Sequence, residues 1–211
     1  MRRLLLAVLC LVPVASRALA ADQTIRGREL VVKNRSTPDK RKVIVRAKES
    51  ASDDTLVGDP RFNGAVLTVH ANGDTPSTET FNLPAASWTG DAITGFRYKD
   101  ATGANGAVRI VQIKKTPNGL FTLKAIILGS LGPISIVPPN LGTDGCAILD
   151  IPPDGDSYSV KFASGNVINH DVKEFRVTRP TAEGSCKELL CGNGVLDPGE
   201  QCEAEIGRAH V

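Results

Sequence analysis

The sequence predicts an all-β fold, a two-sheet antiparallel sandwich with a jelly-roll or Greek-key topology. Short runs rich in β-branched and aromatic residues recur between residues 21 and 182, separated by glycine, proline, asparagine and aspartate. Several runs alternate apolar with polar residues, as strands with one buried face do. Long runs with helical periodicity are absent from this region, whose length of about 160 residues is typical of one domain.

The predicted strands follow one another at short intervals. They are residues 30–33, 42–48, 65–71, 79–83, 92–99, 107–115, 120–128, 133–137, 147–151, 158–163 and 172–178. Residues 65–71 place Ala65, Leu67 and Val69 on one face. Phe96 and Tyr98 share a face in the same way, as do the residues at odd positions from 121 to 127.

One connection between strands is well defined. Residues 107–115 and 120–128 flank Thr116-Pro117-Asn118-Gly119, in which proline presets the first turn angle and glycine accepts a positive φ. The sequence therefore predicts a β-hairpin here. Further turns are predicted at Asn72-Gly73-Asp74 and Pro153-Asp154-Gly155-Asp156.

Each strand of such a hairpin buries one face, so two sheets are needed to close a dry core. The predicted core residues are Leu67, Val69, Phe96, Val111, Ile113, Phe121, Leu123, Val160, Phe162 and Phe175.

The N-terminal segment is typical of a secretory signal peptide, assigned to residues 1–20. Arg2 and Arg3 are followed by an apolar run that is too short to span a bilayer, and Ala18-Leu19-Ala20 is an A-x-A cleavage site before Ala21. We therefore expect a secreted or cell-surface protein, cleaved near Ala20-Ala21. No membrane span is expected after it.

Removal of this segment changes the charge balance. Without Arg2, Arg3 and Arg17, the 25 basic residues of the chain fall to 22, against 23 acidic ones. A basic stripe with interleaved aromatic residues is missing, so no nucleic-acid partner is expected. The densest basic cluster, residues 40–42 with Arg46 and Lys48, is interpreted as the solvated face of a strand.

Four cysteines follow the predicted cleavage site, and an exported chain meets an oxidising compartment. Disulfides are therefore favoured over a zinc site, and three pairings are open. The disulfide candidates are Cys146, Cys186, Cys191 and Cys202.

The run Cys191-Gly192-Asn193-Gly194-Val195-Leu196-Asp197-Pro198-Gly199-Glu200-Gln201-Cys202 has too many glycine and proline residues for a helix or a central strand. It resembles the start of the cysteine-rich repeat of secreted and surface proteins of myxobacteria and their relatives. We assign residues 183–204 to a truncated copy of this repeat, a short cysteine-rich C-terminal loop module. Back-translation of residues 206–211 matches the start of a sequencing adapter, so we interpret residues 205–211 as an artefact and expect a longer natural protein.

The β segment, residues 21–182, also resembles a domain of exported proteins from the same bacterial groups. The matching features are Val32-Lys33-Asn34, the basic strand 42–48, the run 59–65 (D-P-x-x-x-G-A) and Trp88. The resemblance implies a secreted β domain and no established activity.

Motifs of catalysis are missing from the sequence. Neither His70 nor His170 lies in a dense ligand cluster, and no G-x-S-x-G nucleophile elbow is present. We therefore expect a protein that is not an enzyme and has no cofactor. The accessory part of an exported hydrolase remains an alternative.

Calcium is the one metal for which candidate ligands exist, because it binds oxygen donors from acids, amides and carbonyls. One group is Asp150, Asp154 and Asp156 around a glycine turn. The other is Asn193, Asp197 and Glu200 in the cysteine loop. Acids that merely suit exposed turns are the competing interpretation.

Together these features predict a secreted or cell-surface, non-catalytic binding or structural module of a larger exported bacterial protein. Its partner is unknown, and a surface glycan or a protein is the class we expect. A carbohydrate-binding module is the alternative, for which Trp88 is the candidate ligand platform; a buried role for Trp88 is the competing interpretation.

Overall fold

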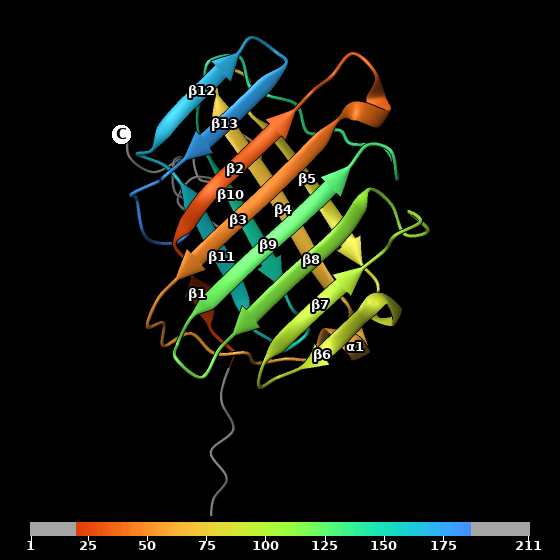
Figure 1. The fold of residues 1–211 in the computed structure, drawn as a ribbon, viewed down its shortest axis with the longest axis vertical. Helices are drawn as coiled ribbons and strands as arrows, with labels where there is room; N and C mark the ends of the chain where they lie inside the picture. The colour runs from red at the N-terminus through yellow and green to blue at the C-terminus, as the bar shows by residue number, and fades with distance from the viewer. Residues whose placement is uncertain (1–19, 187–211) are drawn as a thin grey trace, which may run out of the picture.

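The computed structural model describes residues 20–186 and confirms the two-sheet sandwich (Figure 1). One sheet has five strands in the order β1-β11-β10-β4-β5, and the other has eight in the order β12-β13-β2-β3-β9-β8-β7-β6. The strands are β1 (Asp22–Thr24), β2 (Gly27–Lys33), β3 (Lys42–Glu49), β4 (Ala65–Gly73), β5 (Ser77–Leu83), β6 (Trp88–Asp91), β7 (Gly95–Lys99), β8 (Val108–Lys115), β9 (Phe121–Leu128), β10 (Gly142–Asp150), β11 (Ser157–Phe162), β12 (Asn166–His170) and β13 (Glu174–Thr178). Neighbouring strands are antiparallel, except that β1 runs parallel to β11.

The described helices are three short segments, η1 (Pro38–Lys40), α1 (Pro60–Asn63) and η2 (Ala85–Ser87). Asp59 caps α1, because its carboxylate accepts a hydrogen bond from the Arg61 backbone N–H at 2.9 Å. Among residues 20–186, no helix has the length and apolar character needed to cross a membrane.

The chain leaves the eight-stranded sheet after β3 and later returns to pair with this strand. After β3 it crosses to the five-stranded sheet and forms β4 and β5. It re-enters the eight-stranded sheet at the far edge with β6 and returns strand by strand until β9 pairs with β3 (Figure 1). This return to an earlier strand is of the Greek-key kind.

The predicted hairpin between β8 and β9 is confirmed. The two strands pair from Lys115 with Phe121 onward, and the Gly119 N–H donates to the Thr116 carbonyl at 3.0 Å. Gly119 has a φ of 71°, which a residue with a side chain rarely adopts.

The core lies between the two sheets, and every predicted core residue is buried there. Phe121 of β9 and Tyr158 of β11 meet across the two layers with ring centroids 5.8 Å apart. Their contact joins strands that are distant in sequence and fixes the two sheets face to face.

Two strand predictions need correction. Residues 133–137 form no strand: the N–H groups of Ser135 and Ile136 donate to the Glu79 side chain at 2.9 Å instead of pairing with a backbone. The predicted strand 92–99 is shorter, because the Asp91 carboxylate accepts hydrogen bonds from the N–H groups of Ile93 and Thr94 and closes a turn before β7. Strands β1, β6 and β12 were not predicted.

The disulfide joins Cys146 of β10 to Cys186, so it pairs two of the four candidates. Both half-cystines are buried with Ile148 in a small cluster separate from the main core. The bond ties the segment after β13 to the five-stranded sheet. Cys191 and Cys202, like the proposed signal peptide up to residue 19 and the repeat motif, lie outside the described residues.

Candidate functional site

The two sheets differ sharply in charge. The strands of the eight-stranded sheet contain twelve lysines and arginines against four acids. Those of the five-stranded sheet contain one lysine, Lys161, against four acids. The chain as a whole is close to neutral, with 25 basic and 23 acidic residues, whereas the strands of one sheet carry a clear excess of positive charge.

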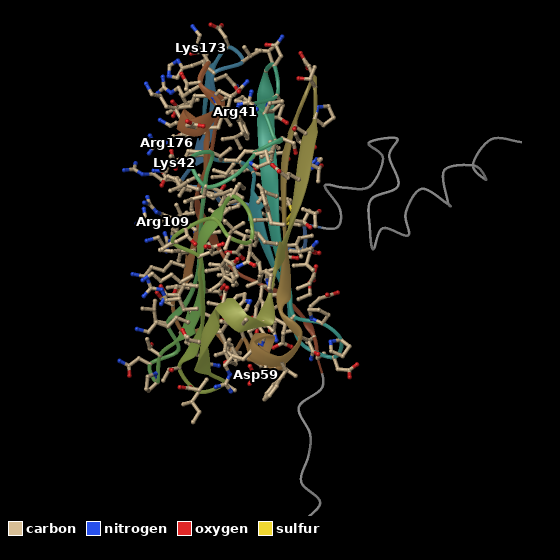
Figure 2. All side chains as sticks on the ribbon, turned by 90° about the vertical axis from the view of Figure 1, so that its right-hand side faces the viewer. Arg41, Lys42, Asp59, Arg109, Lys173 and Arg176 are labelled. Atoms are coloured by element: carbon tan, nitrogen blue, oxygen red, sulfur yellow. A yellow bond between two sulfur atoms is a disulfide. The ribbon has the colours of Figure 1, made fainter. Side chains whose placement is uncertain are left out.

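Strand alternation sends most of these cations to the outside of the sandwich, because the odd-numbered positions of β9 and their partners fill the core. Figure 2 shows Lys42, Arg109 and Arg176 on the same outer side of the eight-stranded sheet. We call this surface the basic face. Its cations are Lys33, Lys42, Arg46, Lys48, Arg97, Lys99, Arg109, Lys114, Lys124 and Arg176.

The register aligns these side chains into rows that run across the strands. One row passes through Arg97, Gln112, Lys124 and Arg46, on four neighbouring strands. Since adjacent strands lie about 4.8 Å apart, the eight strands give the face a width of about 34 Å. The rows thus form a broad surface with regularly spaced positive charge.

An apolar row divides the basic face. Val31, Ile44, Ile126 and Ile110 are in register across β2, β3, β9 and β8. Val31 is buried, and the three isoleucines are half-buried beside the cationic side chains. The face therefore combines charge with a strip of aliphatic contact surface.

Part of the basic face is neutralised internally. Glu29 pairs with both Arg46 and Arg176, and Lys33 pairs with Glu174 at 3.0 Å. Within residues 20–186, the other lysines of the face form no ion pair: Lys42, Lys48, Lys99, Lys114 and Lys124. The unpaired charge lies mainly on β3, β9, β8 and β7.

The β6 border of the face carries one acid, Asp91. Asp91 accepts hydrogen bonds from the backbone N–H groups of Thr94 and Ile93, and these hold its pKa below the usual range. Its carboxylate is occupied with closing the turn between β6 and β7.

Aromatic side chains do not contribute to this surface. Within the described strands of the sheet, the rings of Trp88, Phe96, Tyr98, Phe121 and Phe175 are all buried. The basic face thus has no platform for stacking bases or sugar rings.

Trp88 is therefore not the exposed ligand platform that the carbohydrate-binding alternative required. Only 4% of its surface is exposed. Its Nε1 donates to the Leu83 carbonyl at 3.2 Å, and its ring meets the Tyr98 ring edge-on at 5.6 Å. Trp88 is a core residue.

Of the calcium candidates, the structure describes Asp150, Asp154 and Asp156. Asp156 is fully buried and its two oxygens accept hydrogen bonds from protein donors, whereas Asp154 is exposed. Among residues 20–186, no group of three acids, histidines or cysteines is placed to hold a metal ion. Asn193, Asp197 and Glu200 lie outside the described residues.

His70 belongs to a polar network on the outer side of the five-stranded sheet. Its Nδ1 contacts the Thr78 hydroxyl and its Nε2 contacts the Asn72 amide oxygen, while Asn72 donates to Asp144 at 2.8 Å. The network joins β5, β4 and β10. Because only 1% of His70 is exposed and both ring nitrogens are engaged, we assign it a structural role. His170 is exposed on β12.

The fold and the basic face define a class: an all-β sandwich with a broad, positively charged outer sheet face. No protein-family model, curated protein or solved structure matches the chain.

Proposed function

We propose that the chain is a non-catalytic binding module of an exported protein and that its basic face binds an anionic surface polysaccharide. The observation that carries the proposal is the segregation of cations onto one sheet. The strands of the five-stranded sheet carry only one basic residue, whereas those of the eight-stranded sheet carry twelve. Random placement of surface charge would not give such an uneven distribution.

Charge complementarity favours a polymer rather than a small anion. The unpaired lysines are distributed over four neighbouring strands, about 14 Å across the sheet and about 20 Å along β3, instead of converging on one point. A chain with repeated carboxylate or sulfate groups can contact several of them at once, so that weak individual contacts add up. Such binding releases counterions and weakens as salt is raised.

The chemistry between the charges favours a glycan over other polyanions. Thr122 and Gln112 supply neutral hydrogen-bonding groups within the rows, and the aliphatic row suits the C–H faces of sugar rings. Single-stranded nucleic acid is normally bound through stacking aromatic residues, which this face lacks among the described residues.

The test uses dextran sulfate and uncharged dextran, which share one backbone. We expect the mature chain to bind dextran sulfate, with an affinity that falls as salt rises, and not to bind dextran. The double variant Lys48→Gln/Lys114→Gln removes two exposed, unpaired charges of the face and should weaken binding at least about tenfold and lower the salt dependence.

The matched control, Thr80→Glu/Asn82→Glu, changes the net charge equally on exposed positions of β5. It should retain most of the affinity. Equal losses in both variants would show that net charge alone is responsible and would contradict a role for the basic face. Tighter binding to duplex DNA or anionic vesicles than to dextran sulfate would reject a glycan as the partner.

A further inference from the structure

A buried carboxylate lies beside the predicted start of the mature chain. Asp156 is fully buried at the turn between β10 and β11. Its Oδ2 accepts hydrogen bonds from the Thr55 hydroxyl and the Val57 N–H, both at 2.7 Å, and from the Tyr158 hydroxyl at 3.2 Å. These three donors are neutral.

The fourth donor is the backbone nitrogen of Ala21, which lies 2.9 Å from Asp156 Oδ1 although the two residues are 135 positions apart. The Ser157 N–H in turn donates to the Ala21 carbonyl at 3.1 Å. These two bonds fix Ala21 at the point where β1 begins its parallel pairing with β11.

From this geometry we propose that cleavage after Ala20 creates an α-ammonium group at Ala21 that forms an ion pair with Asp156 and completes the fold. The proposal rests on the cleavage site predicted from the A-x-A motif. Two independent observations therefore meet at one atom: the nitrogen that a secretory peptidase would release is the nitrogen that contacts the buried carboxylate.

The covalent step is an ordinary peptide hydrolysis. Water adds across the Ala20–Ala21 bond, which gives a carboxylate on Ala20 and an amine on Ala21. The amine takes up a proton at neutral pH, because α-amino groups titrate near pH 8.

Cleavage lowers the free-energy cost of burying the charged Asp156 carboxylate. In the precursor the nitrogen belongs to a neutral amide, so a buried carboxylate is held by neutral donors alone. A buried charge is costly unless it is paired with an opposite charge and hydrogen-bonded. After cleavage one of the donors is cationic, and a charge-assisted hydrogen bond is about twice as strong as a neutral one.

The groups around Asp156 include no other cation in direct contact with its carboxylate within the described residues. Burial and the negative charge of Asp156 raise the pKa of Tyr158, so its hydroxyl remains a neutral donor. Burial likewise raises the pKa of Asp54, and the charges of Glu49 and Asp156 add to the effect. Lys115 lies near Asp54 and donates to its backbone carbonyl. No hydrogen bond or ion pair within the described part of the chain brings a basic side chain to the Asp156 carboxylate.

The experiment compares the chain that starts at Ala21 with a chain that starts at Ala20, each released from a fusion without extra residues. The extension moves the α-ammonium group by one residue and leaves all side chains of the fold intact. We expect urea unfolding to show a folded-to-unfolded ratio about tenfold lower for the extended chain. Asp156→Asn should reduce the difference between the two forms to less than about twofold.

Asp154→Asn is the matched control, since Asp154 is an exposed acid in the same turn. It should preserve the tenfold difference. Equal stability of the two wild-type forms would overturn the proposal, as would an undiminished difference in Asp156→Asn.

A second measurement needs no variant. The Ala21 amine should be carbamylated by cyanate at least about tenfold more slowly in the folded chain than in urea, as followed by mass spectrometry. Equal rates would overturn the proposal. Neither measurement involves a glycan, so a negative result leaves the proposed binding function standing.

Discussion

The disulfide between Cys146 and Cys186 should supply a large part of the stability of the sandwich. It closes a loop of 40 residues in sequence separation that contains β11, β12 and β13. In the chain-entropy model, closing such a loop removes about 13 cal/mol/K from the unfolded state, which corresponds to about 3.9 kcal/mol at 25 °C. Small domains are stable by about 5–15 kcal/mol, so loss of the bond should lower the denaturant concentration at the unfolding midpoint markedly.

The assay is urea unfolding with and without a reductant, followed by the emission of Trp88, the only tryptophan of the chain. We expect reduction to lower the unfolding free energy by about 4 kcal/mol. The double variant Cys146→Ala/Cys186→Ala should lose at least as much, because alanine also leaves space in a buried cluster.

The remaining cysteines provide the control. The variant Cys191→Ser/Cys202→Ser should keep its sensitivity to reductant, because the stabilising bond is elsewhere. A loss below about 1 kcal/mol on reduction of the wild-type chain would refute the reasoning.

Two further predictions follow from buried groups. Trp88 should emit at short wavelength in the folded chain and shift to the red in urea, and Trp88→Ala should cost about 3–5 kcal/mol; a red emission from the folded chain would show that the ring is exposed. The Asp100 carboxylate accepts hydrogen bonds from the backbone N–H of Asn105 at 2.7 Å and from other amides of the same loop, which hold its pKa below the usual range. Its stabilising effect is therefore present above about pH 4 and is lost as the pH falls through its lowered value in the folded state. Stability of Asp100→Asn should depend less steeply on pH in this acid range, and an unchanged pH profile would contradict that role.

Much of the fold could be predicted because its signals are local. The alternation from Phe121 to Ile127 and the turn at Gly119 each depend on a few neighbouring residues, and both are confirmed. Residues 133–137 misled the prediction because they are apolar enough for a strand, yet side chains of β5 occupy their N–H groups. Strand β12 lacked any alternation, since all five of its residues are exposed.

The candidate site could not be predicted from the sequence, because it is built by strands that are far apart in the chain. Alternation in β3 identified a solvated basic strand, but nothing in the sequence indicated that β9, β8 and β7 would lie beside it with cations on the same side. The contact between Ala21 and Asp156 likewise joins positions that only the folded chain brings together. By contrast, the low aromatic content of the chain favoured a buried Trp88, and its hydrogen bond to the Leu83 carbonyl satisfies the indole N–H inside the core.

The most direct test of the proposed binding surface is an amide NMR titration, with dextran sulfate, of a labelled chain that starts at Ala21. If the basic face binds the polymer, chemical-shift changes should concentrate on β3, β9, β8 and β7 and disappear when salt is raised. Changes concentrated on the five-stranded sheet, or changes that persist at high salt, would contradict it.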